Sequence, residues 1–369
     1  MTIVIAGGGL SGSMLAAHLA AEPRCAGPVV MVDDRHNPLA TAEWASWTTR
    51  RGLLDTAVSR RFDRVRVHAG GVHRTLGLGR YRYQVVRGAD HASAVAALTG
   101  TRPGFSVHKG HVDEVTGDGV VVDGTLMPAE WVFDSVPRRT EAADAWLVFR
   151  GWRLHTDRPA FDPAVPTFFD FRTSQRQAAS FLYVLPESPH DALVEHTAFA
   201  AEETARPEAQ RAALAEYLAE VIGTEYTVRR EESASLPLVA KAPSRRRGRA
   251  LTIGAKAGMV KASTGYAYQR IQRDSAAIAR SLAEHGHPFA IPEPRPRHRL
   301  FDGALLDVIT HDPPQLERAF AALFDRASAE PVLKFLDEDT SIGQEARLFA
   351  KLPASVYLGA VSRRRKLSD

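Results

Sequence analysis

The stretch TIVIAGGGLSGSMLAAHLAAE, residues 2–22, decides the fold of the N-terminal part of the chain. Its β-branched opening predicts a strand, and its alanine-rich end predicts a helix. Between them, Gly7, Gly9 and Gly12 have the spacing G-x-G-x-x-G. In this motif the first glycine permits a tight turn, the second lets a pyrophosphate approach the backbone, and the third lets helix and strand pack closely. We therefore expect phosphates at the N-terminus of this helix, where free N–H groups and the helix dipole favour anions.

A second predicted strand, PVVMVDD at residues 28–34, supports the same interpretation. Asp33 follows Gly12 by about 20 residues, the distance expected for the acid that binds a ribose. A glycine-rich turn without a ligand would not explain the position of this acid. The N-terminal segment therefore predicts a dinucleotide-binding site.

The length of the chain, 369 residues, favours FAD over NAD as the dinucleotide. An N-terminal fingerprint followed by long non-Rossmann segments is typical of FAD-dependent proteins. The later stretch RALTIGAKAGMVKASTGYAYQRIQRDSAAIARSLAEHG, residues 249–286, predicts a strand, a glycine-containing loop and a long helix that return to the cofactor. Ala255 and Lys256 stand where many FAD proteins carry an acidic residue, which argues against an ordinary flavin hydroxylase. The residues assigned to cofactor binding are Gly7, Gly9, Gly12, Asp33, Gly254, Gly258, Thr264 and Gly265.

Composition and charge limit the class of protein. The formal net charge is only +4, and much of it lies in two runs, residues 244–249 and 362–369. These runs lack a nucleic-acid-binding motif, so solvated loops are the preferred interpretation, with contact to anionic lipid headgroups as a further one. Cys25 is the only cysteine, which excludes an intrachain disulfide and a cysteine-based metal site and suits a reducing cytoplasm. No metal ligand set is assigned, and the sequence shows neither a secretion signal nor a run of about 18 apolar residues that could span a bilayer.

The remaining chain predicts an α/β protein with a divided domain arrangement. Residues 1–140 and 239–286 are expected to form a discontinuous, Rossmann-like FAD-binding domain with a three-layer ββα arrangement. The strand-rich segment 141–238, interrupted by a helix near 207–222, predicts an antiparallel sheet over the flavin. Residues 44–51, WASWTTRR, predict a loop, and the proline-rich residues 287–299 predict a linker. Apolar residues at helical spacing predict a C-terminal helical region within 287–369, as ordinary core or as a membrane-facing surface.

Glu195 lies within a predicted hairpin, SFLYVLPESPHDALVEHTAFA at residues 180–200. Because side chains alternate along a strand, Leu193, Thr197 and Phe199 would share its face. A carboxyl group in such an apolar setting holds its proton longer than one in water, as a general acid requires. On these residues alone a solvated or structural glutamate stays the commoner interpretation, because structural carboxylates outnumber catalytic ones.

Four stretches together resemble the flavin-dependent lycopene cyclase family. They are FRGWRLHTDRPAFDP at 149–163, FLYVLPESPHDALVEHTAFA at 181–200, EESASLPL at 231–238 and IGAKAGMVKASTGYAYQRIQ at 253–272. The resemblance covers nearly the whole chain and implies FAD binding without net oxidation of the substrate. It further implies closure of a ring at the end of a linear carotenoid, with Glu195 as the proton donor. Two departures from the family pattern, His196 and Ala234, leave room for another polyprenyl or terpenoid substrate.

The chemistry implied by the resemblance assigns roles to further residues. A protonated alkene becomes a tertiary carbocation, which aromatic faces stabilise and which a reduced, anionic flavin would stabilise electrostatically. Either Glu195 as carboxylate or Glu232 could take up the final proton, although Glu232 could equally be a structural ion-pair partner. Lys261 and Thr264 are expected to shape the flavin site, and His196 to be structural on the opposite face. The candidate cation-stabilising residues are Trp44, Trp152, Phe169, Phe171, Tyr183 and Tyr266.

Three functions stay open at the level of sequence. The first is a non-redox FAD-dependent cyclase of carotenoids or terpenoids, with NAD(P)H as the reductant of the flavin. The second is a flavin monooxygenase acting on an apolar substrate, and the third is an isoprenoid carrier without activity. In each case we expect an apolar isoprenoid or carotenoid partner, no nucleic acid, and a cytoplasmic protein with peripheral contact to the inner face of the plasma membrane.

Overall fold

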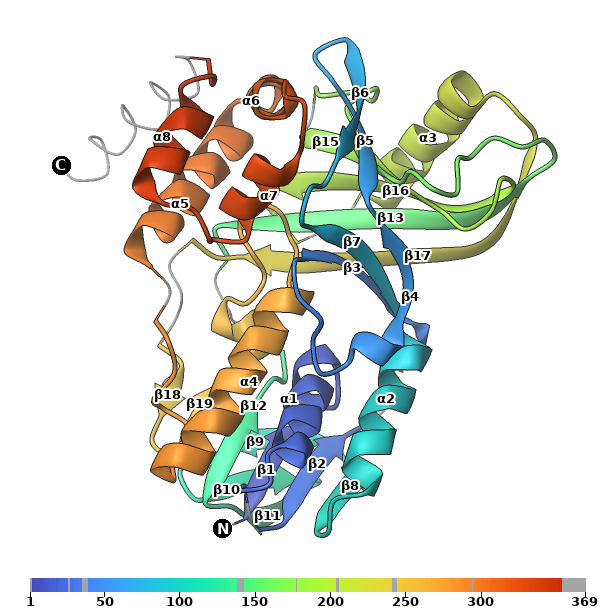
Figure 1. Cartoon of the computed structure of the whole chain (residues 1–369). Helices are drawn as coiled ribbons and strands as arrows, with labels where there is room; N and C mark the ends of the chain where they lie inside the picture. Colours follow the sequence, from blue (N-terminus) through green and yellow to red (C-terminus); the bar gives the residue numbers. More distant parts are fainter. Residues whose placement is uncertain are drawn as a thin grey trace.

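The computed structural model describes residues 2–25, 27–34, 39–137, 143–176, 178–203, 206–240, 244–293 and 295–353. Their strands form four sheets. Figure 1 shows one helix-covered sheet at the bottom of the molecule and a long-stranded sheet across the top, with the C-terminal helices beside it.

The lower sheet is parallel except at one edge. Its central strand is the β-branched run at the start of the chain, whose four residues are all buried. In spatial order the described strands are β18 (Arg246–Arg247), β19 (Ala250–Thr252), β12 (Trp131–Asp134), β1 (Ile3–Ala6), β2 (Val29–Asp33) and β8 (Phe105–Lys109).

Side-chain alternation along β1 builds the layers on both faces of this sheet. Ile3 and Ile5 pack against α1 (Leu10–Ala21) and α4 (Tyr268–His285). Val4 and Ala6 pack on the other face, against the three-stranded sheet β11 (Thr125–Pro128), β10 (Gly119–Val122) and β9 (Val112–Val115). A further helix, α2 (Gly88–Gly100), lies beside α1. The predicted three-layer ββα arrangement is therefore confirmed.

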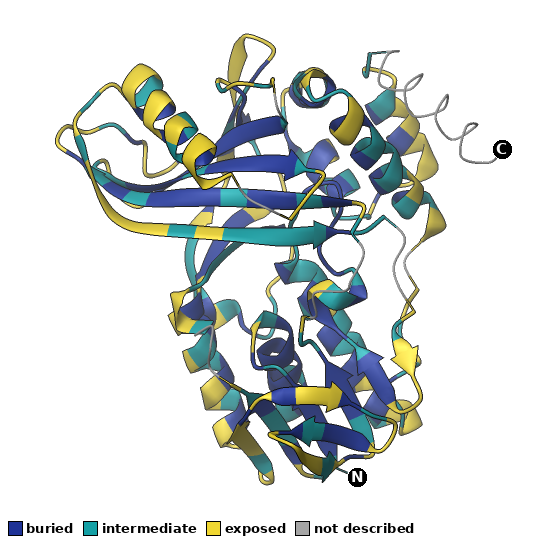
Figure 2. Cartoon of the chain, turned by 180° about the vertical axis from the view of Figure 1, so that it is seen from behind, coloured by how far each residue is buried: buried dark blue, intermediate teal, exposed yellow. Residues whose placement is uncertain are grey.

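The upper sheet is antiparallel apart from one pair, β14 with β5. Its strands are long, and Figure 2 shows that the central ones are largely buried. In spatial order the described strands are β17 (Tyr226–Leu238), β13 (Ala145–Thr156), β16 (Asp191–Ala200), β15 (Ala179–Pro186), β14 (Thr167–Asp170), β5 (Arg64–Ala69) and β6 (Val72–Gly77). Helix α3 (Pro207–Tyr217) and the π-type turn η3 (Leu218–Ile222) cover one face of this sheet. Together they confirm the helix that was predicted near residues 207–222.

A small antiparallel sheet lies between the two larger ones (Figure 1). Its order is β3 (Glu43–Thr48), β7 (Arg82–Arg87) and β4 (Val58–Phe62), and the short turns η1 (Leu39–Thr41) and η2 (Asp55–Ala57) precede two of these strands. The prediction of a loop at residues 44–51 was therefore wrong for most of its length. Residues Glu43–Thr48 pair in antiparallel register with β7, about 40 residues further on, and this pairing rather than a local alternation of burial makes the segment a strand.

Two strands from within residues 1–140 pair in the upper sheet. Strands β5 and β6 belong to the upper sheet, although residues 1–140 were assigned to the FAD-binding domain. The segment RVRVHA alternates strictly, and its Val65, Val67 and Ala69 are buried in the core of the upper unit. A pairing between strands so distant in sequence leaves no local signal, so composition alone could not place them.

The C-terminal region is helical, as predicted. Proline at the first turn starts α5, within the segment predicted as a linker. The helices are α5 (Pro296–His311), α6 (Pro314–Phe324), α7 (Glu330–Leu336) and α8 (Ile342–Phe349). The basic run at 362–369 lies outside the described residues. None of the helices in the described ranges has both the length and the apolar character that a membrane crossing requires.

Candidate active site

The first glycine-rich turn has the geometry that its spacing predicts. Gly7 has a φ of +96°, which favours glycine. A Cβ added to Gly12 would lie 1.8 Å from the carbonyl oxygen of Gly7, so only glycine allows helix α1 to pack this closely. A Cβ on Gly9 would meet nothing within 4 Å, so this backbone is open to a ligand. The turn therefore fits the pyrophosphate of a dinucleotide.

Asp33 lies at the carboxyl end of β2, beside this turn. The backbone N–H of Gly8 donates a hydrogen bond of 2.7 Å to Oδ2 of Asp33. The first turn of α1 begins without a side-chain cap, so its N-terminal N–H groups are directed at the same region. The structure thus brings together the glycines and the acid that were predicted to bind a dinucleotide.

The second glycine-containing loop contacts both the first turn and the upper sheet. Gly254 starts the turn η4 (Gly254–Ala257) with a φ of +72°, and a Cβ there would lie 2.2 Å from Oγ of Ser11. Gly258 and Gly265 also have positive φ, and a Cβ on Gly265 would lie 2.1 Å from Cδ2 of Leu147 on β13. The buried Thr264 precedes Gly265 in this loop. The predicted cofactor residues therefore lie where the two units meet.

Lys256, which stands in this loop where many FAD proteins carry an acidic residue, forms an ion pair with Asp134. Its Nζ lies 2.8 Å from Oδ2 of Asp134 at the end of β12. The pair fixes η4 to the parallel sheet, so the loop keeps its position although its own sequence carries a cation.

Two glutamates lie in one row across the upper sheet. In the antiparallel register Gly151 of β13 is opposite Glu232 of β17 on one side and Glu195 of β16 on the other, and Glu195 is opposite Tyr183 of β15. Residues directly opposite each other share a face of the sheet. Gly151 has no side chain, and a Cβ there would lie 2.8 Å from Cδ1 of Leu193 and 3.2 Å from Cγ of Glu232, so the neighbouring side chains close over this position. This row brings together both predicted catalytic residues.

Glu195 is protonated over an unusually wide pH range. Burial raises its pKa to about 8, and the negative charges of Glu232 and Glu43 add to the rise, while a hydrogen bond from Thr197 opposes it. That bond, from Oγ1 of Thr197 to Oε1 of Glu195, is 2.8 Å long. The residue is of intermediate exposure, although the surrounding protein desolvates its carboxyl group. A neutral carboxyl group at this position can donate a proton.

Aromatic rings gather on the same face of the sheet. Tyr183 and Phe169 are 5.8 Å apart between ring centroids, and Phe171 lies 5.8 Å from Phe181. Tyr266 lies 6.4 Å from Tyr183. Four of the predicted cation-stabilising residues, Phe169, Phe171, Tyr183 and Tyr266, thus belong to the cluster beside Glu195.

The cluster also contains aromatic residues that were not predicted, and Trp47 and Tyr83 are among them. The ring of Trp47 lies 4.4 Å from that of Tyr266, and the hydroxyl of Tyr83 lies 3.1 Å from the hydroxyl of Tyr266. Both come from the small sheet, on β3 and β7. Strand alternation in WASWT could have shown that Trp44 and Trp47 face opposite ways once the segment was recognised as a strand.

Trp44 and Trp152 lie elsewhere, so their predicted place beside Glu195 was wrong. Trp44 is on the other face of β3, with its ring 5.4 Å from that of His91. Trp152 is on the α3 side of β13, where its Nε1 donates a 2.9 Å hydrogen bond to Glu231. His196 is on that same side, as predicted, and burial lowers its pKa to about 4.

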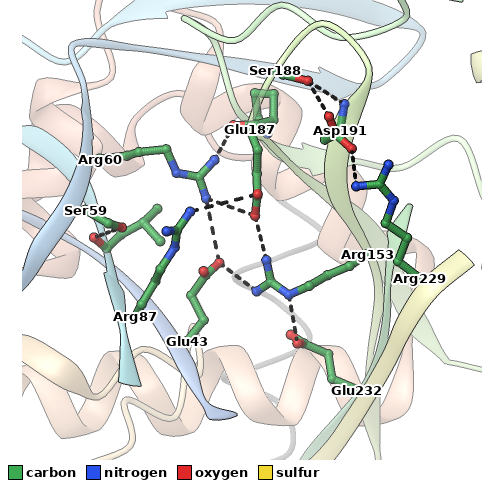
Figure 3. A network of polar contacts seen from close by, with 12 residues as sticks. Glu43, Ser59, Arg60, Arg87, Arg153, Glu187, Ser188, Asp191, Arg229 and Glu232 are labelled. Atoms are coloured by element: carbon green, nitrogen blue, oxygen red, sulfur yellow. Dashed lines mark hydrogen bonds and ion pairs between the residues drawn. The ribbon is translucent and has the colours of Figure 1, made fainter. Parts of the chain in front are cut away.

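A network of ion pairs closes the end of the row (Figure 3). Arg153 of β13 lies 3.1 Å from Glu43 of β3, 2.6 Å from Glu187 in the β15–β16 turn and 3.6 Å from Glu232. The sequence alone did not single out Arg153 or Glu43. A contact between β3 and β13, which are distant in sequence, leaves no local signal.

The parallel sheet with its glycine-rich turns and the antiparallel sheet above them define the class of protein as one with the two-unit flavoprotein fold. The model of the family described as lycopene cyclase protein matches residues 2–361. The chain therefore belongs to the lycopene cyclase family. Among curated proteins, none has a matching sequence.

Solved structures share this fold at low sequence identity. The flavin-dependent brominase Bmp2 is 14% identical, with a TM-score of 0.65 over 99% of this chain and 100% of that chain. A geranylgeranyl bacteriochlorophyll reductase-like protein from Thermoplasma acidophilum is 13% identical, with a TM-score of 0.62 over 96% of this chain and 97% of that chain. The p-nitrophenol 4-monooxygenase PnpA from Pseudomonas putida is 15% identical, with a TM-score of 0.57 over 100% and 97% of the two chains.

Proposed function

We propose that this member of the lycopene cyclase family is an FAD-dependent, non-redox cyclase that protonates a terminal alkene of lycopene or a related polyprenyl substrate and closes a ring. The observation that supports it best is Glu195, a buried carboxyl group with a pKa of about 8. It stands beside a cluster of aromatic rings and next to the loop that carries Gly265. An acid, a cation-stabilising wall and an adjacent cofactor loop are the parts that this chemistry needs.

The reaction balances without an external oxidant. The carboxyl proton of Glu195 forms a C–H bond at the terminal alkene and leaves a tertiary carbocation. A second alkene of the same chain attacks this carbon, so one C–C bond forms and the charge moves into the new ring. Transfer of a proton from a neighbouring carbon to Glu195, now a carboxylate, or to Glu232 restores an alkene, and the product has the mass of the substrate. The rings of Tyr183 and Phe169 would stabilise the positive charge and exclude water.

The residues of the two glycine-rich turns fit FAD as the cofactor. The open backbone at Gly9, the N-terminus of α1 and Asp33 would hold its pyrophosphate and ribose, and the loop at Gly254–Gly265 would hold the rest against β13. The bound flavin, reduced by NAD(P)H, would supply negative charge near the developing cation. This role requires no net electron transfer to the substrate.

The substrate class suggests where the protein works. Carotenoids and polyprenyl chains reside in the bilayer, so we propose a cytoplasmic protein that makes peripheral contact with the inner face of the plasma membrane. In a flotation assay with anionic liposomes, a large share of the protein should rise with the vesicles. Complete absence from the vesicle fraction would contradict this contact.

An anaerobic assay tests the proposed function. Lycopene in liposomes is incubated with the purified protein, FAD and a chemical reductant. The products are separated by chromatography, and their masses are measured by mass spectrometry. We expect a cyclic product of unchanged mass. If no such product forms, but NADPH is consumed once oxygen is admitted, the protein is a monooxygenase and the proposal fails. If neither occurs, the assay with lycopene contradicts the cyclase proposal for this substrate, and mass spectrometry of co-purified lipid identifies a carrier.

A further inference from the structure

In the row that contains Glu195 and Glu232, a positively charged side chain among the described residues contacts the carboxyl group of Glu232 but not that of Glu195. Arg153 follows Gly151 by two residues on β13, so it projects from the same face of the sheet. Its Nε lies 3.6 Å from Oε2 of Glu232. Among the described residues, the hydrogen-bond partner of Glu195 is Thr197, and no arginine or lysine is within ion-pair distance of it.

Arg153 is fixed in this position by contacts from three elements. Its guanidinium binds Glu43 of β3 at 3.1 Å and Glu187 at 2.6 Å, in addition to Glu232 of β17 (Figure 3). The side chain is only 21% exposed and that of Glu43 only 6%. A half-buried arginine with three carboxylate partners cannot turn toward Glu195 without breaking contacts that are costly to lose in a low-dielectric setting.

We propose that Arg153 is a positioning residue that gives the two glutamates of the row opposite tasks, because it holds Glu232 as the ionised base and leaves Glu195 as the acid. This inference rests on the proposed function and deepens it. It assigns the final proton of the cyclisation to Glu232, which lies on the other side of Gly151 from Glu195. Proton exchange with solvent then returns a proton to Glu195 and removes one from Glu232 before the next turnover. Since both residues are glutamates on one face of one sheet, only their neighbours can distinguish them.

The charges around the row agree with this division. Burial raises the pKa of both glutamates, and the positive charge of Arg153 opposes the rise in each. At Glu232 the contact with Arg153 is direct, whereas Glu195 has only the longer-range part of that charge. The negative charge of Glu43 raises both pKa values. The titratable or charged groups facing Arg153 and the row are Glu43, Arg60, Tyr83, Arg87, Tyr183, Glu187, Glu195, Arg230, Glu232 and Tyr266.

The pH dependence of the reaction tests the proposal. The wild-type rate should fall at low pH as Glu232 takes up a proton and at high pH as Glu195 loses one. Arg153→Gln removes the positive charge beside Glu232, so the low-pH limb of the rate profile should move to higher pH by about one unit. Arg153→Lys keeps a positive charge and should return the limb part of the way to its wild-type position. Glu43→Gln should move the same limb downward, because a negative charge is removed. A structural role for Arg153 would instead lower the rate equally at every pH.

Arg60→Gln is the matched control, because Arg60 contacts Glu43 and Glu187 but not Glu232. It should move the low-pH limb much less than Arg153→Gln does. Infrared absorption of protonated carboxyl groups gives a readout independent of turnover, and Arg153→Gln should make one carboxyl group titrate at higher pH. If Glu195→Gln abolishes turnover but both limbs and the infrared titration stay unchanged in Arg153→Gln, Arg153 does not have this role. If Glu195→Gln keeps full activity, the proposed function itself fails.

Discussion

Glu195 and Glu232 are the same residue type on one face of one sheet, yet their surroundings differ. The alternation of Leu193, Glu195, Thr197 and Phe199 correctly predicted an apolar setting for Glu195, and its pKa of about 8 follows from that burial. The partners of Glu232 could not be predicted, because Arg153 and Glu43 reach it from strands distant in sequence. At the residue scale the apolar setting of Glu195 could therefore be predicted from its own strand. Its role as an acid was implied by the family resemblance, and the charged partners of Glu232 required the structure.

Replacement of Glu195 by Gln should stabilise the protein in a pH-dependent way. In the folded chain the pKa of Glu195 is raised from 4.5 to about 8. Between these values the unfolded chain releases a proton that the folded chain retains, so the wild-type free energy of unfolding falls as pH rises. The change is up to about 1.4 kcal/mol for each unit of pKa. Gln has no such proton, so the advantage of Glu195→Gln should be absent below pH 4.5, grow as pH rises and level off above pH 8.

Chemical denaturation at several pH values measures this difference. Glu208→Gln is a suitable control, because the Glu208 side chain is 88% exposed and its ion-pair partner among the described residues is the surface residue Arg211. The control should show a much smaller pH-dependent difference. Parallel stability curves for wild type and Glu195→Gln would show that Glu195 is not buried as a neutral acid.

At the element scale, the cofactor turn was predicted in full and the small sheet was not. The strand–turn–helix of residues 2–22 is local, so its glycine spacing, its helix and Asp33 are all readable from the sequence. Strands β3, β4 and β7 are short and pair with one another across intervening segments, and β5 pairs in parallel with β14 about 100 residues further on. Non-local pairing is the reason that the loop prediction at residues 44–51 and the placement of residues 64–77 in the FAD-binding domain differ from the structure.

The turn gives a direct prediction for the cofactor. A Cβ at Gly12 would lie 1.8 Å from a backbone oxygen, so Gly12→Ala must displace α1 from β1. We expect FAD affinity to fall at least about tenfold, or about 1.4 kcal/mol, as measured by flavin fluorescence during titration. Gly100→Ala, at the end of α2, adds a methyl group that meets nothing within 4 Å and should leave FAD affinity unchanged. Unchanged affinity in Gly12→Ala would show that this turn does not hold the cofactor.

At the scale of the whole molecule, buried charges join the cofactor loop to the C-terminal helices. Nζ of Lys261 lies 3.0 Å from Oδ1 of Asp302 on α5 and 3.0 Å from Oε1 of Glu338, which follows α7. Arg270 of α4 also contacts Glu338. The predicted role of Lys261 in shaping the loop thus extends to the docking of a complete helical region, which no local pattern indicated.

Removal of this lysine should destabilise the protein strongly. Lys261→Met leaves the carboxylate of Asp302 buried without its cation, and breaking such a pair costs on the order of 3 kcal/mol. The double variant Lys261→Met/Asp302→Asn removes the orphaned charge and should recover a substantial part of that loss. The free energy of unfolding from urea titrations measures both effects. A single variant as stable as the wild type would show that the C-terminal helices are not held to the loop by this network.

The most direct test of Glu195 as the proton donor compares three proteins under anaerobic, reducing conditions: the wild type, Glu195→Gln and Thr197→Val. Each is loaded with FAD, supplied with lycopene in liposomes, and assayed for cyclic product of unchanged mass. Thr197 donates the hydrogen bond to Glu195 but carries no acidic proton, so Thr197→Val should retain measurable turnover, whereas Glu195→Gln should form no product while still binding FAD. Cyclic product from Glu195→Gln at the wild-type rate would contradict the assignment of Glu195 as the acid.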